Sequence, residues 1–336
     1  MSTTFENYLN RNTKRMNKLV ADFFKKGSEP DVTRYLYGPL ADYSANGGKR
    51  HRPLICELAC QAVGGDPLLA RSAAAAIEHF HTAALIHDDI ADESMLRRGK
   101  PCMHLTQGEG LAINAGDLAL SQVTGLVVND ENLEDRIKLR ILSELVEMTT
   151  RTIEGQALDI GWARDGRFDI TIKDYLVMAT HKTAYYSGGT PLAVGAIIGG
   201  GSDEEIEALR NFGMATGLAF QIQDDILNLI GKKEAVKKDF RSDITEGKRT
   251  LIVVHAIQHS EQSKELVAIL ASRTSQPTML SIAVDIMQES GSLDFAHDYA
   301  IGLVNNAQAE LMQLLHESKP RDLLLSMADY FISRMS

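Results

Sequence analysis

The chain has 336 residues, of which 44% are apolar and 6% aromatic, so a large core would be built mainly from aliphatic side chains, which favours helices. Its 45 acidic and 35 basic residues give a formal net charge of −10. That excess of acid argues against nucleic acid as the principal partner, because phosphate backbones attract broad basic surfaces.

The three cysteines form no CxxC pair, so Cys56 and Cys60 are expected to be small core residues rather than zinc ligands.

The N-terminal segment, residues 1–26, predicts an amphipathic helix. Its apolar residues, among them Leu9, Met16 and Leu19, are interleaved with Lys and Asn. This pattern differs from the uninterrupted apolar core of a signal peptide. No continuous apolar run in the chain reaches the roughly 18 residues that a membrane span requires. We therefore expect no transmembrane segment and a protein of the cytoplasm.

Helices are expected over most of the chain. The stretch 102–190 contains no proline and can hold several long helices. Within it, an i, i+4 ladder of apolar residues is formed by Leu133, Ile137, Ile141, Leu145 and Met148. Ser202 and Glu205 form a capping-box pattern that marks another helix start. Strand-like alternation is nearly absent, and residues 251–254 are the only β-rich run, so we predict one all-α domain over residues 1–336.

A first acidic motif, LIHDDIAD at 85–92, lies within a helix that is expected to begin near Ala73. Asp88 and Asp92 are four residues apart and share one helix face, with Asp89 beside them. Among apolar neighbours these carboxylates would repel one another unless a cation compensated them. Oxygen ligands of this kind suit Mg²⁺, which commonly bridges one or two carboxylates to substrate phosphates. A solvated acidic helix face is the alternative interpretation.

A second acidic motif, FQIQDDILN at 220–228, repeats the arrangement. Asp224, Asp225 and Asn228 lie within about one helical turn and have apolar residues around them. Two such motifs are hard to explain as solvated helix faces. Together they favour a metal and diphosphate cluster held between two helices.

Basic residues accompany both acidic motifs. Arg97, Arg98 and Lys100 follow the first motif, Lys237, Lys238 and Lys248 follow the second, and GGKRHRP at 47–53 and Lys182 stand apart. Diphosphates need fixed cations as well as metal ions, and Arg and Lys side chains supply them. The combination of acidic and basic motifs therefore predicts a site for diphosphate esters.

With these motifs in this order, the chain resembles the polyprenyl synthetase family of trans-isoprenyl diphosphate synthases from about residue 40 to 260, and is similar to its geranylgeranyl diphosphate synthases. The motifs that carry the resemblance are GGKRHRP (47–53), HTAALIHDDIAD (81–92), RRGKP (97–101), GD (116–117), GQALD (155–159), KTA (182–184), FQIQDDILN (220–228) and KDFRSDITEGKRT (238–250). The resemblance implies one large helical bundle of the isoprenoid synthase type with a central active-site cavity. It also implies a homodimer.

The resemblance further implies a role for each site residue. Isopentenyl diphosphate would be held by Lys49, Arg52, His81 and Arg98, and the allylic diphosphate by Arg97, Lys182, Thr183, Gln221, Lys238 and Lys248. Magnesium would be bound by Asp88, Asp92 and Asp224, with Asp89, Asp225 and Asp159 orienting metal-bound waters. Three magnesium ions are implied with substrate bound, and manganese is expected to substitute.

The activity implied by the resemblance is elongation of an allylic diphosphate, such as dimethylallyl, geranyl or farnesyl diphosphate, by isopentenyl diphosphate. Magnesium and the basic residues would neutralise the leaving diphosphate, and the double bond of isopentenyl diphosphate would attack the allylic cation in a head-to-tail (1′-4) condensation. Lys182, Thr183, Gln221, Asp88 and Asp224 would carry this step, since Thr183 and Gln221 present oxygens toward the developing positive charge.

Two positions depart from the family's commonest pattern. Asn228 stands where many members have the last Asp of the second motif, which weakens the case for it as a metal ligand. Members with Asn there include geranylgeranyl diphosphate synthases, so activity is still expected. Arg241 replaces a usual Gly in the Lys-x-x-Gly-x-Asp loop, which leaves the closure geometry of that loop open.

Product length depends, by the same resemblance, on the helix that precedes the first acidic motif, because the growing tail runs along it to the first bulky side chain. Ala83 and Ala84, five and four positions before Asp88, are small. Phe80 is the next large residue, about 12 Å from Asp88 at ~1.5 Å per residue. If Phe80 faces the tunnel, a product of about C20 is expected, and if it packs against a neighbouring helix, roughly C25 to C40.

Two other functions are compatible with the same motifs. A terpene cyclase of the same fold would ionise an allylic diphosphate without a second substrate and would not need Lys49, Arg52 and Arg98. A non-catalytic subunit of a heteromeric synthase would be expected to lose acidic ligands, whereas both motifs are intact in this chain.

Overall fold

The structure is a computed structural model that describes residues 4–24, 27–231 and 240–333. In these ranges the ordered elements are helices, apart from one antiparallel pair of two-residue strands, β1 (Leu96–Arg97) and β2 (Lys100–Pro101). The prediction of an all-α fold is confirmed, while this small hairpin was not predicted. The β-rich run at 251–254 is the start of a helix, because Thr250 caps its first turn by accepting a hydrogen bond from the backbone N–H of Val253.

The elements follow one another along the chain with short connections. The first half contains α1 (Thr4–Asp22), α2 (Pro30–Val32), the π-helix η1 (Thr33–Tyr37), α3 (Gly38–Ala45), α4 (His51–Ala62), the 3₁₀-helix η2 (Pro67–Ala70), α5 (Arg71–Ala91), α6 (Met103–Gln107), α7 (Glu109–Val128) and α8 (Asp135–Arg164). The second half contains α9 (Ile172–Ala179), the π-helix η3 (Thr180–Gly189), α10 (Thr190–Gly199), α11 (Asp203–Ile230), α12 (Ser242–Thr245), α13 (Leu251–His259), α14 (Ser263–Ala271), α15 (Pro277–Glu289), α16 (Ser292–Leu314) and α17 (Lys319–Ser333).

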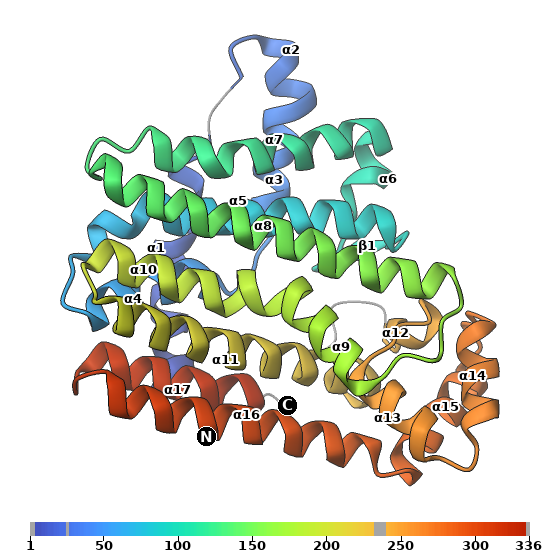
Figure 1. Cartoon of the computed structure of the whole chain (residues 1–336). Helices are drawn as coiled ribbons and strands as arrows, with labels where there is room; N and C mark the ends of the chain where they lie inside the picture. The colour runs from blue at the N-terminus through green and yellow to red at the C-terminus, as the bar shows by residue number, and fades with distance from the viewer. Residues whose placement is uncertain (1–3, 25–26, 232–239, 334–336) are drawn as a thin grey trace.

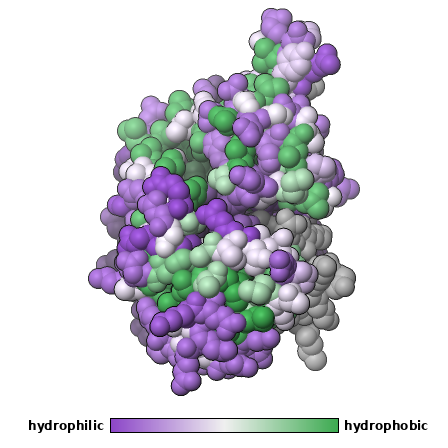
Figure 2. Space-filling view, turned by 90° about the vertical axis from the view of Figure 1, so that its right-hand side faces the viewer, coloured by the Kyte–Doolittle hydropathy of each residue, from purple (hydrophilic) through white to green (hydrophobic). Residues whose placement is uncertain are grey.

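The long helices are stacked in layers (Figure 1). Helices α7 and α8 lie at the top, α4, α10 and α11 form the middle, and α16 and α17 lie at the bottom. The main packing partners are α5 with α7, α4 with α10, α11 with both η3 and α16, and α8 with η3. The segment around α2 projects beyond α7, and it also stands out at the top of the face that Figure 2 shows.

The local signals read from the sequence correspond to these elements. The N-terminal amphipathic helix is α1, whose apolar face is buried. The apolar ladder from Ile137 onward lies on α8, where Ile141, Leu145 and Met148 are buried, whereas Leu133, its first predicted residue, precedes the helix. The capping box between Ser202 and Glu205 is formed in both directions at the start of α11. These predictions are confirmed.

Small residues allow two of the central elements to touch. Gly188 of η3 lies against α11, where a Cβ atom on Gly188 would be 2.1 Å from the carbonyl oxygen of Gly213. A side chain at either position would separate η3 from α11. Because η3 carries Lys182 and α11 carries the second acidic motif, this contact fixes the distance between two parts of the predicted site.

Helix α7 is the one described helix that is long and apolar enough to span a membrane by length and composition. We did not expect such a helix from the search for uninterrupted apolar runs. Its residues Ala112, Ala115 and Ala119 are buried in a cluster with Ala83 and Ile86 of α5. The apolar composition of α7 therefore has a packing role inside the protein.

Candidate active site

The first acidic motif lies at the C-terminal end of α5. Asp88 and Asp92 are partly exposed, whereas Asp89, on a different side of the helix, is 1% exposed. Asp88 accepts a hydrogen bond of 2.5 Å from the side-chain amide of Gln156 on α8. The amide of Gln156 thus holds a carboxylate of α5 toward α8 across the space between these helices.

Asp89 belongs to a buried cluster below the two partly exposed carboxylates. Its Oδ1 forms an ion pair of 2.5 Å with Arg97, and its Oδ2 accepts a hydrogen bond of 2.6 Å from the hydroxyl of Tyr43. Burial, together with the neighbouring charge of Asp89, raises the pKa of Tyr43 and keeps this hydroxyl protonated as a donor. Asp89 therefore fixes the β1 segment and α3 against α5.

The second acidic motif shows the same division on α11. Asp224 is partly exposed and Asp225 is buried. Asp225 accepts hydrogen bonds from Tyr175 (2.9 Å) and from the amide of Gln221 (2.7 Å). Burial and the charge of Asp243 raise the pKa of Asp225. Each motif thus has one buried Asp with protein partners and at least one partly exposed Asp: Asp88 and Asp92 in the first motif and Asp224 in the second.

Gln221 connects this buried Asp to η3. Its carbonyl oxygen accepts a hydrogen bond of 2.7 Å from the hydroxyl of Thr183, while its amide donates to Asp225. The predicted pair of oxygens from Thr183 and Gln221 is therefore close together. Because Asp225 orients the amide, the Gln221 oxygen is the end that remains directed at Thr183.

Lys182, also on η3, meets Asp159 of α8 at 2.5 Å. Burial alone would lower the pKa of Lys182, but the charges of Asp159 and Asp88 outweigh it and raise this pKa. Burial likewise opposes ionisation of Asp159, yet Lys182 and Lys248 hold its pKa below the usual value. Both groups are therefore charged in this arrangement.

Gly155 makes the contact between α8 and η3 possible. A Cβ atom on Gly155 would lie 2.2 Å from the backbone nitrogen of Lys182. Gly155 and Asp159 are four residues apart and lie on the same side of α8. The glycine brings the backbone of η3 close enough for Lys182 to reach Asp159.

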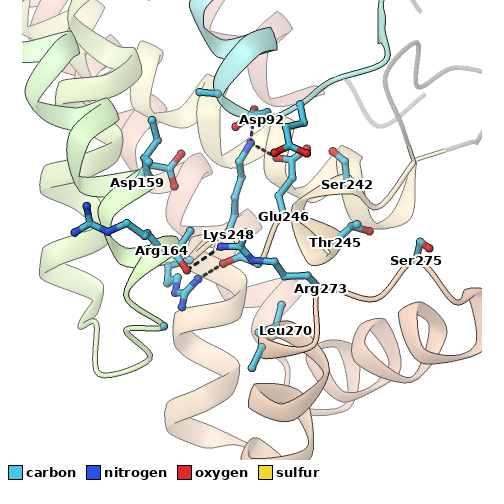
Figure 3. A pocket seen from close by; sticks show the side chains of 18 of the residues that line it. Asp92, Asp159, Arg164, Ser242, Thr245, Glu246, Lys248, Leu270, Arg273 and Ser275 are labelled. Carbon is cyan, nitrogen blue, oxygen red and sulfur yellow. Dashed lines mark hydrogen bonds and ion pairs between the residues drawn. The ribbon is translucent and has the colours of Figure 1, made fainter.

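Lys248 links the loop after α12 to the first acidic motif. Its ammonium group is 3.2 Å from Asp92 and 2.5 Å from Glu246 (Figure 3). Burial would lower its pKa, but these carboxylates raise it well above the usual value. In Figure 3 Asp92, Asp159 and Glu246 surround Lys248 from three elements.

The two positions that depart from the family pattern, Asn228 and Arg241, are joined by a hydrogen bond of 3.1 Å from the backbone N–H of Arg241 to the carbonyl oxygen of Asn228. The side chain of Asn228 accepts a hydrogen bond of 3.3 Å from the backbone of Asp243 and donates one of 3.2 Å to Ser242, so it holds the α12 loop. Arg241 adopts a left-handed backbone with φ of 61°, the conformation that favours the Gly usual at this position. Its guanidinium lies over the ring of Phe240 and donates to the carbonyl of Leu229.

The residues predicted to hold isopentenyl diphosphate gather around α4. Lys49 donates to the hydroxyl of Tyr330 on α17 at 2.5 Å, and Arg52 donates to Ser187 of η3 at 2.8 Å. Arg98 donates to the carbonyl oxygen of Gly47 at 2.6 Å. These three cations from GGKRHRP and RRGKP are thus brought to one region, although 45 or more residues separate Arg98 from the others.

His81 lies beside this group and is buried. Its ring stacks on Tyr186 with centroids 5.7 Å apart, and the guanidinium of Arg52 lies 4.6 Å from the centre of the same tyrosine ring. Burial, with the charges of Arg52 and Arg98, lowers the pKa of His81 well below its usual value. His81 is therefore neutral and offers one N–H and one lone pair.

The predicted chain-length residues lie on different sides of α5. Ala84 is partly exposed, whereas Ala83 is fully buried against α7. Phe80 is 2% exposed and contacts Tyr186, with ring centroids 5.7 Å apart. Phe80, Ala84 and Asp88 follow one another at intervals of four residues on one side of the helix.

A cavity of about 960 Å³ lies beside Asp92, at the C-terminal end of α5 (Figure 3). Its lining includes Asp92, Asp159 and Lys248 from the predicted site, and also Arg164 at the end of α8 and Arg273 after α14. No residue predicted to hold isopentenyl diphosphate lines it. Of the described residues predicted to hold the allylic diphosphate, Lys248 lines it, whereas Arg97, Lys182, Thr183 and Gln221 do not. The cavity therefore borders the predicted site at Lys248.

The donor set suits a hard divalent ion that is completed by substrate. Within the described ranges no three His, Cys, Asp or Glu side chains form a group that could hold a metal ion by themselves. Asp88, Asp92 and Asp224 nevertheless offer oxygen ligands, and Mg²⁺ typically combines one or two carboxylates with phosphate oxygens and water. Lys238, predicted to hold the allylic diphosphate, lies outside the described residues.

Several contacts of the site were missed in the sequence. Gln156 stands inside the motif GQALD, whose position could have suggested it. Tyr43, Tyr175, Tyr330 and Ser187 carry no sequence signal, because each comes from an element remote in the chain from its partner. Only the packing of the helices brings them to the motif residues.

Comparisons with known proteins agree on one family. The family model described as Polyprenyl synthetase matches residues 33–287. The chain is 41% identical over 290 residues to a short chain isoprenyl diphosphate synthase of Methanothermobacter thermautotrophicus, covering 86% of this chain and 87% of that protein.

Two solved structures share the whole fold. The crystal structure of geranylgeranyl pyrophosphate synthetase from Pyrococcus horikoshii is 33% identical with a TM-score of 0.89, covering 98% of this chain and 99% of that one. The structure of geranylgeranyl pyrophosphate synthase from Corynebacterium glutamicum, complexed with isoprenyl diphosphate and magnesium, is 26% identical with a TM-score of 0.85 and covers 99% of both chains. The chain therefore belongs to the polyprenyl synthetase family and is a prenyltransferase.

Proposed function

We propose that this prenyltransferase condenses isopentenyl diphosphate with an allylic diphosphate in a magnesium-dependent reaction that gives a trans-polyprenyl diphosphate of C20 or somewhat longer. The observation that carries the proposal is the pairing of acidic with basic residues across the site: Asp89 with Arg97, Asp92 with Lys248, and Asp159 with Lys182. Such pairs place fixed cations next to carboxylates. A diphosphate with divalent ions matches that mixture, because the ions suit the carboxylates and the phosphate oxygens suit Lys and Arg.

The metal would be held by Asp88 and Asp92 of α5 and by Asp224 of α11, with Asp89, Asp225 and Asp159 behind them. Magnesium supplies charge that stabilises the departing diphosphate. The relative complexed with isoprenyl diphosphate and magnesium supports magnesium as the ion. We further propose that three ions act together and that manganese substitutes, because both ions favour oxygen ligands.

The residues of the chain would perform the remaining tasks. Lys182 and Lys248, which are charged, bind the allylic diphosphate together with Arg97 and Lys238, and stabilise negative charge as the carbon–oxygen bond breaks. The oxygens of Thr183 and Gln221 face the allylic carbon and stabilise its positive charge.

The second substrate would bind on the other side of the reacting carbons. Lys49, Arg52 and Arg98 hold the diphosphate of isopentenyl diphosphate, and neutral His81 donates a hydrogen bond to it. Fixed at this end, isopentenyl diphosphate directs its double bond at the allylic cation, and the released diphosphate accepts the proton that is lost.

The length of the product would be set along α5. A tail that starts near Asp88 passes Ala84 and meets Phe80, which is 2% exposed and packs against Tyr186 of the neighbouring helix η3. The path would therefore be closed by this pair of rings and not by Phe80 alone, and the longer products expected for a packed Phe80 stay within the proposed range. The geranylgeranyl synthases among the similar structures support a product of about C20.

We also propose that the protein is a homodimer that uses the outer face of α8. Leu139, Val146, Ile153 and Ile160 recur every seven residues on this helix and are 70%, 58%, 58% and 42% exposed. Their spacing forms an apolar stripe about 32 Å long at ~1.5 Å per residue. Such a stripe on one chain can pack against its copy across a two-fold axis, which buries both.

Two further properties belong to the proposal. The buried face of α7 supports a water-soluble protein that acts in the cytoplasm. One packed core that includes elements from α1 to α17 supports a single domain over residues 1–336.

The activity is tested by incubating the protein with Mg²⁺, labelled isopentenyl diphosphate, and C5, C10 or C15 allylic primers, and then sizing the products. We expect elongation with at least one primer and no elongation when the metal is chelated. The rate of elongation should fall at least about a hundredfold in the double variant Asp88→Asn with Asp224→Asn. Absence of any elongated product would contradict the proposal. A hydrocarbon formed from the primer alone would indicate a cyclase instead.

A further inference from the structure

Arg50 lies between two residues of the proposed isopentenyl diphosphate site but does not share their surroundings. Lys49 is exposed, whereas Arg50 is 4% exposed. Its backbone is left-handed with φ of 54°, and it is the last residue before α4, which carries Arg52 in its first turn. The loop thus turns at Arg50, and the side chain there points into the protein.

The guanidinium of Arg50 is bound by three other helices. It donates to the side chain of Asn17 on α1 at 2.8 Å, to Glu78 on α5 at 2.6 Å and to the backbone carbonyl of Ser44 on α3. A left-handed conformation of a residue other than Gly persists only where surrounding contacts impose it. These contacts provide that constraint.

Glu78 is as buried as its partner, with side-chain exposures of 2% for Glu78 and 3% for Arg50. A buried carboxylate requires a compensating charge, and removal of one member of a buried ion pair leaves the other uncompensated. Arg50 provides the compensation here. The pair neutralises itself, so Lys49, Arg52 and Arg98 remain as the positive charges that can meet a diphosphate.

We propose that the buried pair of Arg50 and Glu78 is a positioning device for the isopentenyl diphosphate site. Arg50 does not bind phosphate itself. It holds the turn that places Lys49 on one side and Arg52 on the other, and it ties this turn to α1, α3 and α5. The inference rests on the proposed function of Lys49 and Arg52.

Steady-state kinetics of Glu78→Gln and Arg50→Lys test the inference. Each variant should raise the KM for isopentenyl diphosphate about tenfold or more, because small displacements of binding groups are costly. The KM for the allylic diphosphate and kcat should change by less than about twofold, since Lys182 and Lys248 lie on other elements.

The pair of Arg15 and Glu57 offers a matched control. It joins α1 to α4 through two hydrogen bonds of 3.0 and 2.6 Å, both between Arg15 and Glu57 and neither to the 47–50 loop. Glu57→Gln should therefore lower stability without altering the KM for either substrate.

Two results would overturn the inference. A folded Glu78→Gln variant with an unchanged or lowered KM for isopentenyl diphosphate would show that Arg50 acts as a phosphate ligand or has no role. Equal rises of both KM values would show a general structural effect. If Glu78→Gln does not fold, as judged by circular dichroism, Arg50→Lys and Glu78→Asp are judged by the same criteria.

Direct binding separates this inference from the proposed function. Calorimetry with isopentenyl diphosphate alone measures the site without turnover. If the wild-type protein binds isopentenyl diphosphate but forms no product, the proposed function is contradicted. The role of Arg50 and Glu78 can then still be tested by comparing the binding affinity of their variants with that of the wild type. Wild-type protein that does not bind isopentenyl diphosphate would contradict the inference as well.

Discussion

Within each acidic motif, neighbouring Asp residues have different surroundings. Asp89 and Asp225 are buried and bound by Tyr43 and Tyr175, whereas their neighbours toward the site are partly exposed. Consecutive residues of a helix point about 100° apart, so one Asp of each Asp-Asp pair turns to the core while the other faces the site. A buried carboxylate with full partners serves structure and orientation, and a partly exposed one is available to a metal ion.

Phe80 provides a residue-scale prediction on product length. Phe80→Ala should lengthen the product by at least one isoprene unit, because it removes the ring that contacts Tyr186 and opens the path beyond Ala84. Chromatographic sizing of the prenyl products measures the change. Ala83→Val is the control, since Ala83 packs against α7; unchanged products in Phe80→Ala would remove Phe80 as the floor.

His79 should make stability depend on pH. It is fully buried and stacks on Phe24, and burial lowers its pKa from 6.5 to about 4. Between pH 6.5 and 4, His79 is protonated in the unfolded chain but stays neutral in the folded protein. Stability from neutral His79 is therefore complete above about pH 6.5 and falls by up to about 3 kcal/mol as the pH drops to about 4.

Denaturant unfolding at several pH values checks this expectation. The difference in unfolding free energy between the wild type and His79→Phe, which retains a ring but does not titrate, should change by that amount over the window. A difference independent of pH would contradict the assignment. Subtracting the two proteins removes the contribution of the carboxylates that titrate in the same range.

At the scale of elements, η3 is the part on which the site depends. This π-helix carries Lys182 and Thr183, and it is enclosed by α8 and α11. Its close contacts use Gly155 on one side and Gly213 on the other. Stretches of π-helix often occur at functional sites, where the wider turn redirects side chains.

Substitution of Gly155 tests the dependence on η3. Gly155→Ala should destabilise the protein by about 1–3 kcal/mol and weaken activity, because the new Cβ collides with the backbone of Lys182 and separates this lysine from Asp159. Thermal unfolding and the KM for the allylic diphosphate measure the two effects.

Gly161 on the same helix is the matched control. A Cβ atom there would meet nothing within 4 Å. Gly161→Ala should therefore stabilise the protein by up to about 1 kcal/mol through helix propensity and leave activity unchanged. If both substitutions had the same effect, the close contact at Gly155 would not be the cause.

For the whole molecule, the arrangement of layers leaves α7 and α8 at one side (Figure 1). The apolar stripe of α8 is exposed. Exposed apolar residues are ordinary when scattered, whereas a regular row on one helix indicates a contact surface. The side of α8 that carries Gln156 and Asp159 is directed at Asp88 of α5 and Lys182 of η3. Dimer contacts on α8 would therefore support the wall that carries Gln156 and Asp159.

The proposed dimer is tested by Val146→Glu with Ile153→Glu. Two charges in the middle of the stripe should convert the dimer to a monomer, because burying unpaired carboxylates is costly. Light scattering after size-exclusion chromatography measures the mass. Leu68→Glu, at a residue that is 65% exposed on η2, should leave the dimer intact; a wild-type monomer would contradict the proposal.

The sequence by itself determined the helical class and the family. These follow from local information: spacing along a helix places Asp88 with Asp92, and the capping box of Ser202 and Glu205 starts α11 without help from distant residues. The left-handed conformation at Arg241 agrees with the Gly that the family usually has there. The metal ligands and substrate contacts assigned from the motifs remain predictions.

Tertiary structure alone decided which residues complete the site. Lys49 meets Tyr330 and Arg50 meets Glu78 because α17 and α5 pack beside α4, and no period or motif in the sequence records those distances. The packing of α7 on α5 also decided which chain-length residue is enclosed. Ala83 packs on α7, whereas Ala84 and Phe80 lie on the other side of α5. Side-chain packing depends on the contact of surfaces remote in the chain, whereas helix formation depends largely on neighbours within a few turns.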